Sequence, residues 1–531
     1  MSTEASGQTG RPGINPWFIA VTVTLATFME VLDTSIANVA LPHIAGSLSV
    51  SLEESTWVLT SYLVANAIIL PLSGWLSNVI GRKRFYLISV FIFTASSALC
   101  GMATSLESLV FFRVLQGLGG GGLQPSEQAI LMDTFPASKR GMAMAVYGLA
   151  VLVAPVLGPT LGGYITDNYN WRWIFYINLP VGALSIILSG MLVQDPPYLK
   201  KQRAAFRGKP LRVDFIGLGL LSLGLASLEI VLDKGQTLDW FGSPFIVRCA
   251  VIAAVCIVAA IIWELRTPDP IVNLRLLRDR NFAVAAVGVF CAFGVLYGST
   301  VLLPQMLQTL MGYSALNAGL VLSPAGIATM LEMPVIGILL SRGVDARRLI
   351  AVGLGIVAFA CFWMSGLTLE IAPGQVIWPR IVQTMGAGLL WVPINTAAYS
   401  YISKEQINNA SGLFNLIRNE GSSIGVALAT TLLQRRTQFH QFRLSEHVHS
   451  LNPLANRQIA GAASFFARAG SDPVTARRQG LGLLYANMQR QAAVMSYLDI
   501  FQFFAVLSLL VIPMLFLMKR SVAQGGELAA H

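Results

Sequence analysis

The sequence predicts an all-α integral membrane protein, because apolar residues are abundant, charged residues are rare and long apolar stretches recur along the chain. Of its 531 residues, 54% are hydrophobic and only 12% are charged, and the mean hydropathy is +0.64. Charged residues make up about a quarter of an ordinary soluble domain, and a soluble fold could not hide so much apolar surface. Most of the chain is therefore expected to lie in a lipid bilayer, in contact with membrane lipids.

Fourteen stretches are long enough to cross a bilayer, since a spanning helix needs roughly 20 apolar residues. They are 17–41, 56–77, 85–104, 109–132, 141–165, 172–193, 214–234, 244–265, 282–304, 316–340, 349–368, 378–401, 409–433 and 496–518. The first stretch is longer than the apolar core of a signal peptide and contains two acidic residues, so we interpret it as a retained span.

The distribution of Lys and Arg predicts how these spans are oriented. If the N-terminus is cytoplasmic, the short cytoplasmic loops hold many basic residues and the short outer loops hold almost none, which follows the positive-inside rule. Both termini are then cytoplasmic. The segment 434–495 lies outside with eight Arg residues, but segments of this length do not follow the rule. We therefore interpret the net charge of +10 as a property of topology, and we expect no nucleic-acid partner.

Short patterns recur at one offset, which indicates two duplicated bundles. PLSG at 71–74 returns as PVIG at 334–337, and Gly158 and Gly162 return as Gly421 and Gly425, all displaced by 263 residues. We predict a six-helix bundle in residues 1–193, and cytoplasmic linkers with two inserted helices (214–265) in residues 194–281. Residues 282–531 form a second six-helix bundle that includes a periplasmic loop, 434–495. Parallel halves of this kind place a substrate site at their interface near mid-membrane.

Five segments resemble motifs of a known family. GWLSNVIGRKR at 74–84, RVLQGLGGG at 113–121 and APVLGPTLGG at 154–163 resemble motifs of the major facilitator superfamily, the last of them its antiporter signature. LDTSIANVALP at 32–42 and WRWIFYINLPVG at 171–182 are similar to the fourteen-span drug:proton antiporters of the EmrB/QacA family. The resemblance covers essentially the whole chain. It implies a major facilitator fold with 14 transmembrane helices, two six-helix bundles plus two inserted helices.

The same resemblance implies a function and partners. It implies proton-driven efflux of lipophilic or amphipathic toxic compounds across the bacterial inner membrane by alternating access. The long outer segment is similar to that of EmrB-type members, which work in Gram-negative tripartite pumps with a periplasmic adaptor (membrane fusion) protein and an outer-membrane channel. We find no H-E-x-x-H or Walker lysine motif in the sequence, and we expect no enzyme activity, no cofactor and no metal, with the proton gradient as energy source.

The family motifs supply residues expected to serve gating or close packing. They are Gly74, Gly81 and Arg82 in the loop motif, and Gly158, Pro159, Gly162 and Gly163 in the fifth span. Small residues four apart let helices approach closely, and prolines bend a span, which suits a pliable seal between halves. Plain helix packing is the alternative. The loop motif usually carries an acid where this chain has Asn78, so a charge contact of that acid cannot form here.

Ionisable residues inside spans are costly in a bilayer and are functional by default. Glu30 and Asp33 lie three apart on one helix face, where two like charges in apolar surroundings favour proton uptake by one of them. Asp33 and Arg113 lie at compatible depths and could pair. We therefore predict proton coupling by Asp33, Glu30 and Arg113, with a static structural pair as the alternative.

Substrate contacts are less clearly marked in the sequence. Glu127 and Glu332 could hold a cationic substrate or widen the proton path, with snorkelling to water or hydrogen bonding in the bundle as the alternative. Arg418 could contact an anion or a carboxylate, with a structural role as the alternative. Met and aromatic side chains suit varied lipophilic compounds. Among these we select Phe293, Tyr297 and Trp391 as candidates, with ordinary packing as the alternative.

Two other functions stay open at this point. One is export of a specific physiological metabolite, such as a fatty acid or a siderophore. The other is a membrane-embedded sensor or enzyme without transport. Glu30 and Asp33 have Phe293 and Leu296 at the repeat offset of 263, so only one half carries the acidic pair. This asymmetry favours ion coupling over a scaffold.

Overall fold

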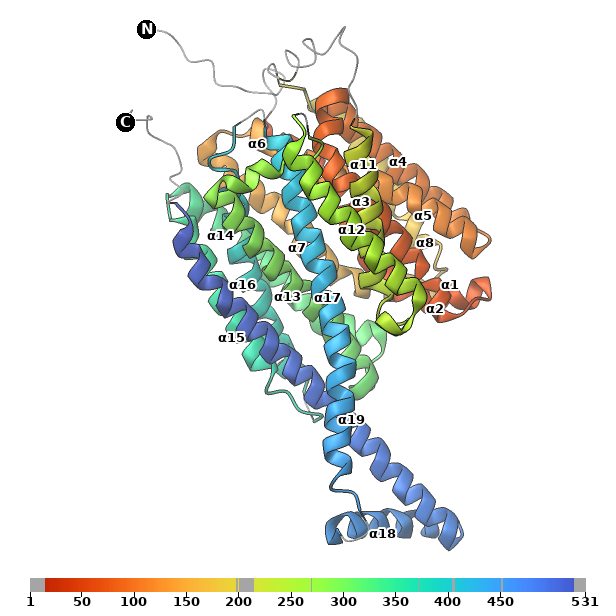
Figure 1. Ribbon diagram of the computed structural model, residues 1–531. Helices are drawn as coiled ribbons and strands as arrows, with labels where there is room; N and C mark the ends of the chain where they lie inside the picture. The colour runs from red at the N-terminus through yellow and green to blue at the C-terminus, as the bar shows by residue number, and fades with distance from the viewer. Residues whose placement is uncertain are drawn as a thin grey trace, which may run out of the picture.

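A computed structural model of the chain describes residues 15–196, 199, 214–268, 270–370, 372–403, 406–449 and 452–519. Within these residues all regular secondary structure is helical. The helices lie side by side in one elongated bundle, from which a helical hairpin projects at one end (Figure 1). We call that end of the molecule the hairpin side.

The N-terminal bundle holds the first six predicted spans. Its helices are α1 (Pro16–Leu48), α2 (Leu52–Ser55), α3 (Trp57–Ile80), α4 (Arg82–Met102), α5 (Leu106–Gly120), α6 (Leu123–Thr134), α7 (Ala137–Asn168), α8 (Trp173–Tyr176) and α9 (Asn178–Leu192). The predicted span 109–132 is split between α5 and α6. Glycines at the break let the two helices approach α3, because a Cβ at Gly121 would lie 2.7 Å from the carbonyl oxygen of Asn66.

The inserted pair consists of α11 (Phe215–Lys234) and α12 (Pro244–Arg266). The short 3-10 helices η1 (Trp240–Gly242) and η2 (Leu274–Arg278) flank α12. α11 packs against α12, α3 and α17, and Leu225 of α11 joins Ala67 and Leu416 in a small apolar cluster. The inserted pair therefore lies over a seam between the two bundles.

The C-terminal bundle repeats the arrangement of the first. Its helices are α13 (Arg280–Met311), α14 (Ala315–Ser341), α15 (Ala346–Met364), α16 (Pro373–Tyr399), α17 (Ile407–Ser445), α18 (Pro453–Arg468), α19 (Pro473–Val511) and η4 (Ile512–Leu517). α1 packs on α7 in the first bundle as α13 packs on α17 in the second. At both contacts a glycine of the repeated pattern touches the facing helix: Gly158 meets Ser35, and Gly425 meets Gly294.

The segment 434–495 is more regular than the sequence suggested. We expected an outer segment of possible short helices after a span ending at 433, but α17 and α19 continue through the predicted boundaries and form the hairpin, with α18 across its tip (Figure 1). The predicted spans were too short because hydropathy falls at residues 433 and 496, although the residues beyond these points still favour a helix. Pro453 and Pro473 divide the segment as expected, since each begins a helix capped by the preceding Asn452 or Asp472.

Asp499 of α19 connects the two long helices of the hairpin near its base. Its Oδ2 atom accepts a hydrogen bond from Arg436 Nε at 2.6 Å and lies 2.7 Å from His440 Nε2. The two arms are therefore tied together by side chains as well as by packing.

Eleven helices of the described residues are long and apolar enough to cross a membrane. This finding confirms the all-helical membrane fold, whereas the predicted count of fourteen stays a prediction. Three predicted spans fall outside the eleven: they correspond to α5 with α6, which are 15 and 12 residues long, and to the longer but more polar α16 and α17.

Candidate functional site

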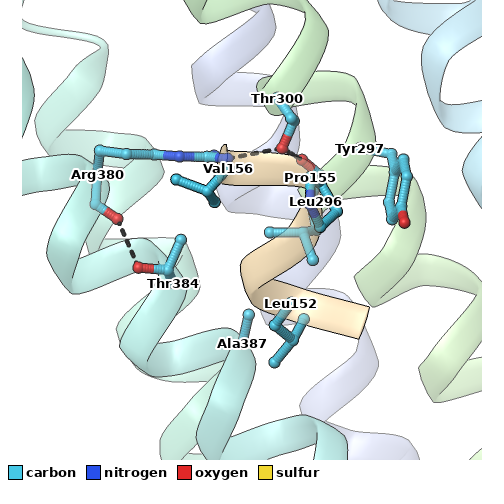
Figure 2. A pocket seen from close by; sticks show the side chains of 9 residues that line it. All are labelled: Leu152, Pro155, Val156, Leu296, Tyr297, Thr300, Arg380, Thr384 and Ala387. Atoms are coloured by element: carbon cyan, nitrogen blue, oxygen red, sulfur yellow. Dashed lines mark hydrogen bonds between the residues drawn. The ribbon is translucent and has the colours of Figure 1, made fainter. Parts of the chain in front are cut away.

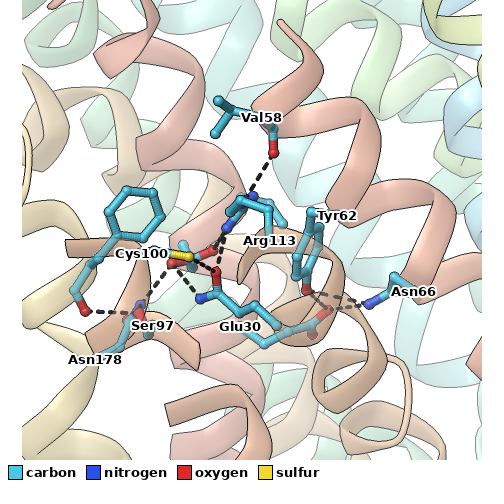
Figure 3. A network of polar contacts seen from close by, with 12 residues as sticks. Glu30, Val58, Tyr62, Asn66, Ser97, Cys100, Arg113 and Asn178 are labelled. Atoms are coloured by element: carbon cyan, nitrogen blue, oxygen red, sulfur yellow. Dashed lines mark hydrogen bonds and ion pairs between the residues drawn. The ribbon is translucent and has the colours of Figure 1, made fainter. Parts of the chain in front are cut away.

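A buried polar network in the N-terminal bundle includes Arg113 and Asn178 (Figure 3). Asp33 of α1 is an acceptor for both side chains. Its carboxylate accepts hydrogen bonds from Arg113 Nη1 at 2.6 Å, Asn178 Nδ2 at 2.7 Å and Gln116 Nε2 at 3.1 Å. Asp33 is 2% exposed and Arg113 is fully buried. The predicted pair is thus present, and three donors from α5 and α9 satisfy the carboxylate that α1 carries into the bundle.

Arg113 is held in place on several sides. Its Nε donates to the backbone oxygen of Val58 at 2.9 Å, and its Nη1 also donates to Gln116 Oε1 at 2.8 Å. The guanidinium lies over the ring of Tyr62, 4.4 Å from its centroid. The guanidinium is therefore held where its positive charge can compensate the negative charge of Asp33 in the protein interior.

Glu30 lies one turn before Asp33 on α1 and forms an adjoining network. Its Oε1 accepts from Tyr62 Oη at 3.0 Å and from Asn66 Nδ2 at 3.4 Å, and its Oε2 accepts from Gln124 Nε2 at 2.5 Å. Tyr62 therefore contacts both the Arg113 cation and the Glu30 carboxyl group, as Figure 3 shows. The two acids share one helix face, as predicted, but each has its own donors.

Arg418 connects Glu30 to the other bundle. Its guanidinium donates to Tyr147 Oη at 3.1 Å and, in a short contact, to Gln124 Oε1. Because the amide of Gln124 also donates to Glu30, a chain of hydrogen bonds runs from α1 through α6 to α17. This link crosses the interface between the two halves.

The aromatic candidates gather beside Arg418. The guanidinium lies 5.4 Å from the ring centroid of Phe293 and 5.5 Å from that of Trp391. Phe293 also contacts Trp391, with ring centroids 4.7 Å apart, and stacks on Tyr297 at 5.8 Å. Three residues selected from the sequence therefore form one cluster, which provides a cation beside an apolar, polarisable surface.

The two remaining acidic candidates lie elsewhere. Glu127 is fully buried and accepts a hydrogen bond from Thr24 Oγ1 at 2.6 Å, while its Oε2 has no hydrogen-bond partner among the described residues. Glu332 is half-buried on α14 and faces Gly388 of α16. Glu127 thus lies against α1 in the first bundle, and Glu332 does not join the network around Arg418.

A small pocket lies between α7, α13 and α16 (Figure 2). Its lining includes Tyr297 and Arg380. Arg380 begins the sequence RIVQTMG at 380–386, which repeats RVLQGLG at 113–119, so Arg380 is the counterpart of Arg113. Arg380 donates to Thr300 Oγ1 at 2.6 Å, Ser299 Oγ at 3.1 Å and Gln383 Oε1 at 2.6 Å. The arginine is thus repeated together with a glutamine three residues later, but its partners here are neutral.

The loop-motif residues lie where α3 meets α4 and α17. Gly81 has φ of +100°, a conformation that favours glycine, and Arg82 forms a buried ion pair with Asp133. A Cβ at Gly74 would lie 2.9 Å from the backbone oxygen of Asn408, so glycine permits the close approach of α17. Asn78 Oδ1 accepts a hydrogen bond from Asn408 Nδ2 at 2.7 Å, which puts a neutral contact where the motif usually has an acid.

The antiporter-signature residues lie on α7, next to α1. A Cβ at Gly162 would be 3.2 Å from a methyl group of Ile36. Thr166 Oγ1 donates to the backbone oxygens of Gly162 and Gly163 at 2.8 and 3.1 Å, and Pro155 and Pro159 interrupt the hydrogen bonding of the helix.

Comparison with known proteins decides the family. Residues 23–426 match the model of the Major Facilitator Superfamily. The chain belongs to this superfamily. It is therefore a membrane transporter and not an enzyme, as the sequence predicted.

Relatives within the superfamily cover nearly the whole chain. The chain is 37% identical over 510 residues to "Multidrug export protein EmrB" of Escherichia coli (strain K12), which covers 96% of each protein. It is also 37% identical over 509 residues to "Fatty acid resistance protein FarB" of Neisseria gonorrhoeae, covering 96% of this chain and 97% of the relative. The predicted EmrB-type resemblance is confirmed.

A solved structure supports the fold. The crystal structure of the human organic anion transporter MFSD10 (TETRAN) aligns with a TM-score of 0.60 at 14% identity, covering 94% of this chain and 100% of that one. At this identity the likeness shows the major facilitator fold alone.

In this major facilitator protein the two halves also meet through amides and hydroxyl groups near the start of α17, away from the hairpin. Gln128 Oε1 of α6 accepts hydrogen bonds from Asn415 at 2.8 Å, Ser411 at 3.0 Å and Tyr399 at 2.8 Å. Sequence reasoning missed Gln124, Gln128 and Asn415, and the only available signal was an amide side chain within an apolar span. These contacts close the interface at the end opposite the hairpin.

Proposed function

We propose that this chain is a proton-driven multidrug efflux antiporter that exports lipophilic and amphipathic compounds by alternating access. The observation that carries the proposal is the buried Asp33–Arg113 network, which one bundle contains and its repeat replaces with neutral partners around Arg380. The similarity to a relative named as a multidrug export protein supports the same activity.

In this proposal Asp33 carries the proton. Protonation of Asp33 removes the charge that holds Arg113 at 2.6 Å and frees the guanidinium to favour its other acceptors. Glu30 lies next to this pair and is linked through Gln124 to Arg418 of the other half. Proton binding in one bundle can therefore change a contact between the bundles, which is what coupling requires.

The substrate would bind beside Arg418, Phe293, Tyr297 and Trp391, where a charged group adjoins aromatic surface. Glu127 and Glu332 would attract cationic compounds, because each has a carboxyl oxygen without a hydrogen-bond partner among the described residues. No cofactor or metal is needed in this scheme, since the proton gradient supplies the energy.

We further propose fourteen spans in a bacterial inner membrane, with both termini in the cytoplasm. The helices that fall short of the hydropathy expected for a span carry buried arginines: Arg113 of α5, Arg380 of α16 and Arg418 of α17. Helices that line a transport path are expected to be less apolar than those that face lipid. This orientation places the hairpin on the periplasmic side.

The hairpin is proposed to dock a periplasmic adaptor protein, which joins an outer-membrane channel in a tripartite pump. Apolar side chains stand exposed among its arginines, with Phe442, Leu454 and Phe465 between 65% and 69% exposed. Contiguous apolar patches on a protein surface mark protein contacts, and in this proposal the exposed side chains of the hairpin contribute to such a patch. Photo-crosslinkers at Phe442 and Phe465 should capture the adaptor, whereas one at the exposed Phe362 of α15 should not; equal capture at all three positions contradicts the proposal.

Export of a fatty acid is a second candidate. Arg418 beside Phe293 and Trp391 offers a cation for a carboxylate and apolar rings for its tail. A relative named for fatty acid resistance is as similar to the chain as the multidrug relative is.

Purified protein in proteoliposomes distinguishes these functions. With an imposed pH gradient, a lipophilic cationic dye should accumulate against its own gradient, and adding it should release protons detectable with a pH dye. Coupled transport of a long-chain fatty acid but not of any cation in a panel would favour the second candidate. If no compound in the panel is transported in exchange for protons, both the multidrug and the fatty acid proposals are contradicted.

A further inference from the structure

The inserted helix α11 brings a carboxyl group against α17 of the C-terminal bundle. Glu229 of α11 is 3% exposed, and it accepts a hydrogen bond from Ser423 Oγ at 3.1 Å. Glu420 lies three residues before Ser423 on α17, so the two share a helix face. Glu420 is 9% exposed, and neither of its carboxyl oxygens has a hydrogen-bond partner among the described residues.

The charged groups nearby are directed to other partners. Arg418 lies two residues from Glu420, points to another side of α17 and donates to Tyr147 and Gln124. On α11, Lys234 donates to Thr56 and lies over the ring of Trp57 at 4.8 Å. Asp233, one turn beyond Glu229, accepts a hydrogen bond from Thr60 of α3. The Glu229–Glu420 pair therefore faces one further acid and has no ion pair among the described residues.

Two facing carboxyl groups in apolar surroundings cannot both stay ionised without a counter-ion. A proton is the smallest ligand that neutralises such a pair, and the two groups then titrate as a unit. We propose that Glu229 and Glu420 form a second proton-binding site, through which the inserted helices take part in coupling. The proposal rests on the proposed proton-driven function.

The position of the pair fits exchange with the hairpin side. Glu229 lies five residues, about 8 Å by helical rise, before the end of α11. Asp233 follows on the same face, and the Lys234–Thr56 contact lies at the end of α11. Glu229, Asp233 and Lys234 form a row of polar side chains where α11 packs against α3 and α17. This row is separate from the Asp33 network on α1 and α5.

A hydrophobic carbodiimide tests the site without requiring transport, because it modifies protonated carboxyl groups in apolar surroundings. In the purified full-length protein, mass spectrometry should find Glu229 or Glu420 modified at pH 6, with much less modification at pH 9. Glu446, an exposed acid of the hairpin paired with Arg443, is the internal control and should stay unmodified. Absence of modification at both buried acids at pH 6 overturns the proposal.

Proteoliposomes test the coupling. The double variant Glu229→Gln/Glu420→Gln should move about one proton fewer for each substrate molecule while still binding substrate, and Asp33→Asn should retain carbodiimide modification of the pair. An unchanged proton-to-substrate ratio in the double variant overturns the coupling role. If the unaltered protein carries no proton-coupled substrate but the pair is modified, the site stands and the proposed function fails.

Discussion

Asp33 of α1 and Arg113 of α5 form an ion pair of 2.6 Å in the interior of the N-terminal bundle, 80 residues apart in sequence. Asn178 and Gln116 complete the coordination of the carboxylate, so the pair is satisfied in the absence of water. A buried pair of this kind is stable only while both partners keep their charges. Proton binding at Asp33 therefore changes the energy of the whole network.

Replacing Asp33 with Asn should abolish proton-coupled transport. The amide cannot exchange a proton, but it keeps the size of the side chain and can still accept from Asn178 Nδ2. Substrate-induced proton release in proteoliposomes should disappear, while substrate binding to detergent-solubilised protein should change by less than about tenfold. Asp33→Glu is the matched control and should retain part of the response. Full proton release by Asp33→Asn would contradict a coupling role.

Arg113 and Arg380 allow a comparison within one molecule. Arg113→Gln leaves Asp33 without its cation, and breaking a buried pair costs about 3–5 kcal/mol. Without its cation, Asp33 is more stable in the protonated form and retains its proton. Proton release on substrate addition should therefore fall at least tenfold. Arg380 faces Ser299, Thr300 and Gln383, which are neutral. Arg380→Gln should therefore keep the proton-to-substrate ratio, and equal loss of coupling in both variants would argue against an asymmetric mechanism.

Sequence reasoning was informative where a pattern lies within a helix. The depths of Asp33 and Arg113 along their apolar spans were sufficient to predict that the two could pair, and the offset repeats were sufficient to predict two related bundles. The link from Glu30 through Gln124 to Arg418 was not predictable, because it depends on how closely the bundles approach. Glu229 was overlooked although it is an acid within the predicted span 214–234; its proximity to Glu420 was not predictable, because it depends on the packing of α11 on α17. The hairpin was missed because hydropathy marks where a helix leaves the bilayer and not where it ends.

Gly425 should tolerate no side chain. A Cβ there would overlap the Cα and the carbonyl oxygen of Gly294 on α13, and backbone atoms cannot move aside as a flexible side chain can. Gly425→Ala should destabilise the protein by about 1–3 kcal/mol, as other overpacking changes do. Thermal unfolding in detergent measures the effect. Gly219→Ala in α11 is the control, because a Cβ at Gly219 meets nothing within 4 Å; equal melting temperatures for the two variants would contradict the packing argument.

Asn78 offers a way to restore the acid that the loop motif usually carries. Asn78 Oδ1 accepts from Asn408 Nδ2 at 2.7 Å, one residue after α17 begins at Ile407. A carboxylate at this position would face the N-terminus of α17, and such a contact is worth about 0.3–1 kcal/mol. Asn78→Asp should therefore favour the state closed at the end opposite the hairpin by up to about fivefold.

The population of that state can be followed by labelling a cysteine placed at Ser411, whose hydroxyl group contacts Gln128 across the interface. The reference is the same cysteine with Asn78 unchanged. Asn78→Asp should slow its modification by a membrane-impermeant thiol reagent added from the cytoplasmic side. Asn78→Asp with Asn408→Ala tests the source of the effect: slower labelling should persist if the N-terminus of α17 stabilises the carboxylate. Labelling that is equal or faster in Asn78→Asp would show that this contact does not control closure.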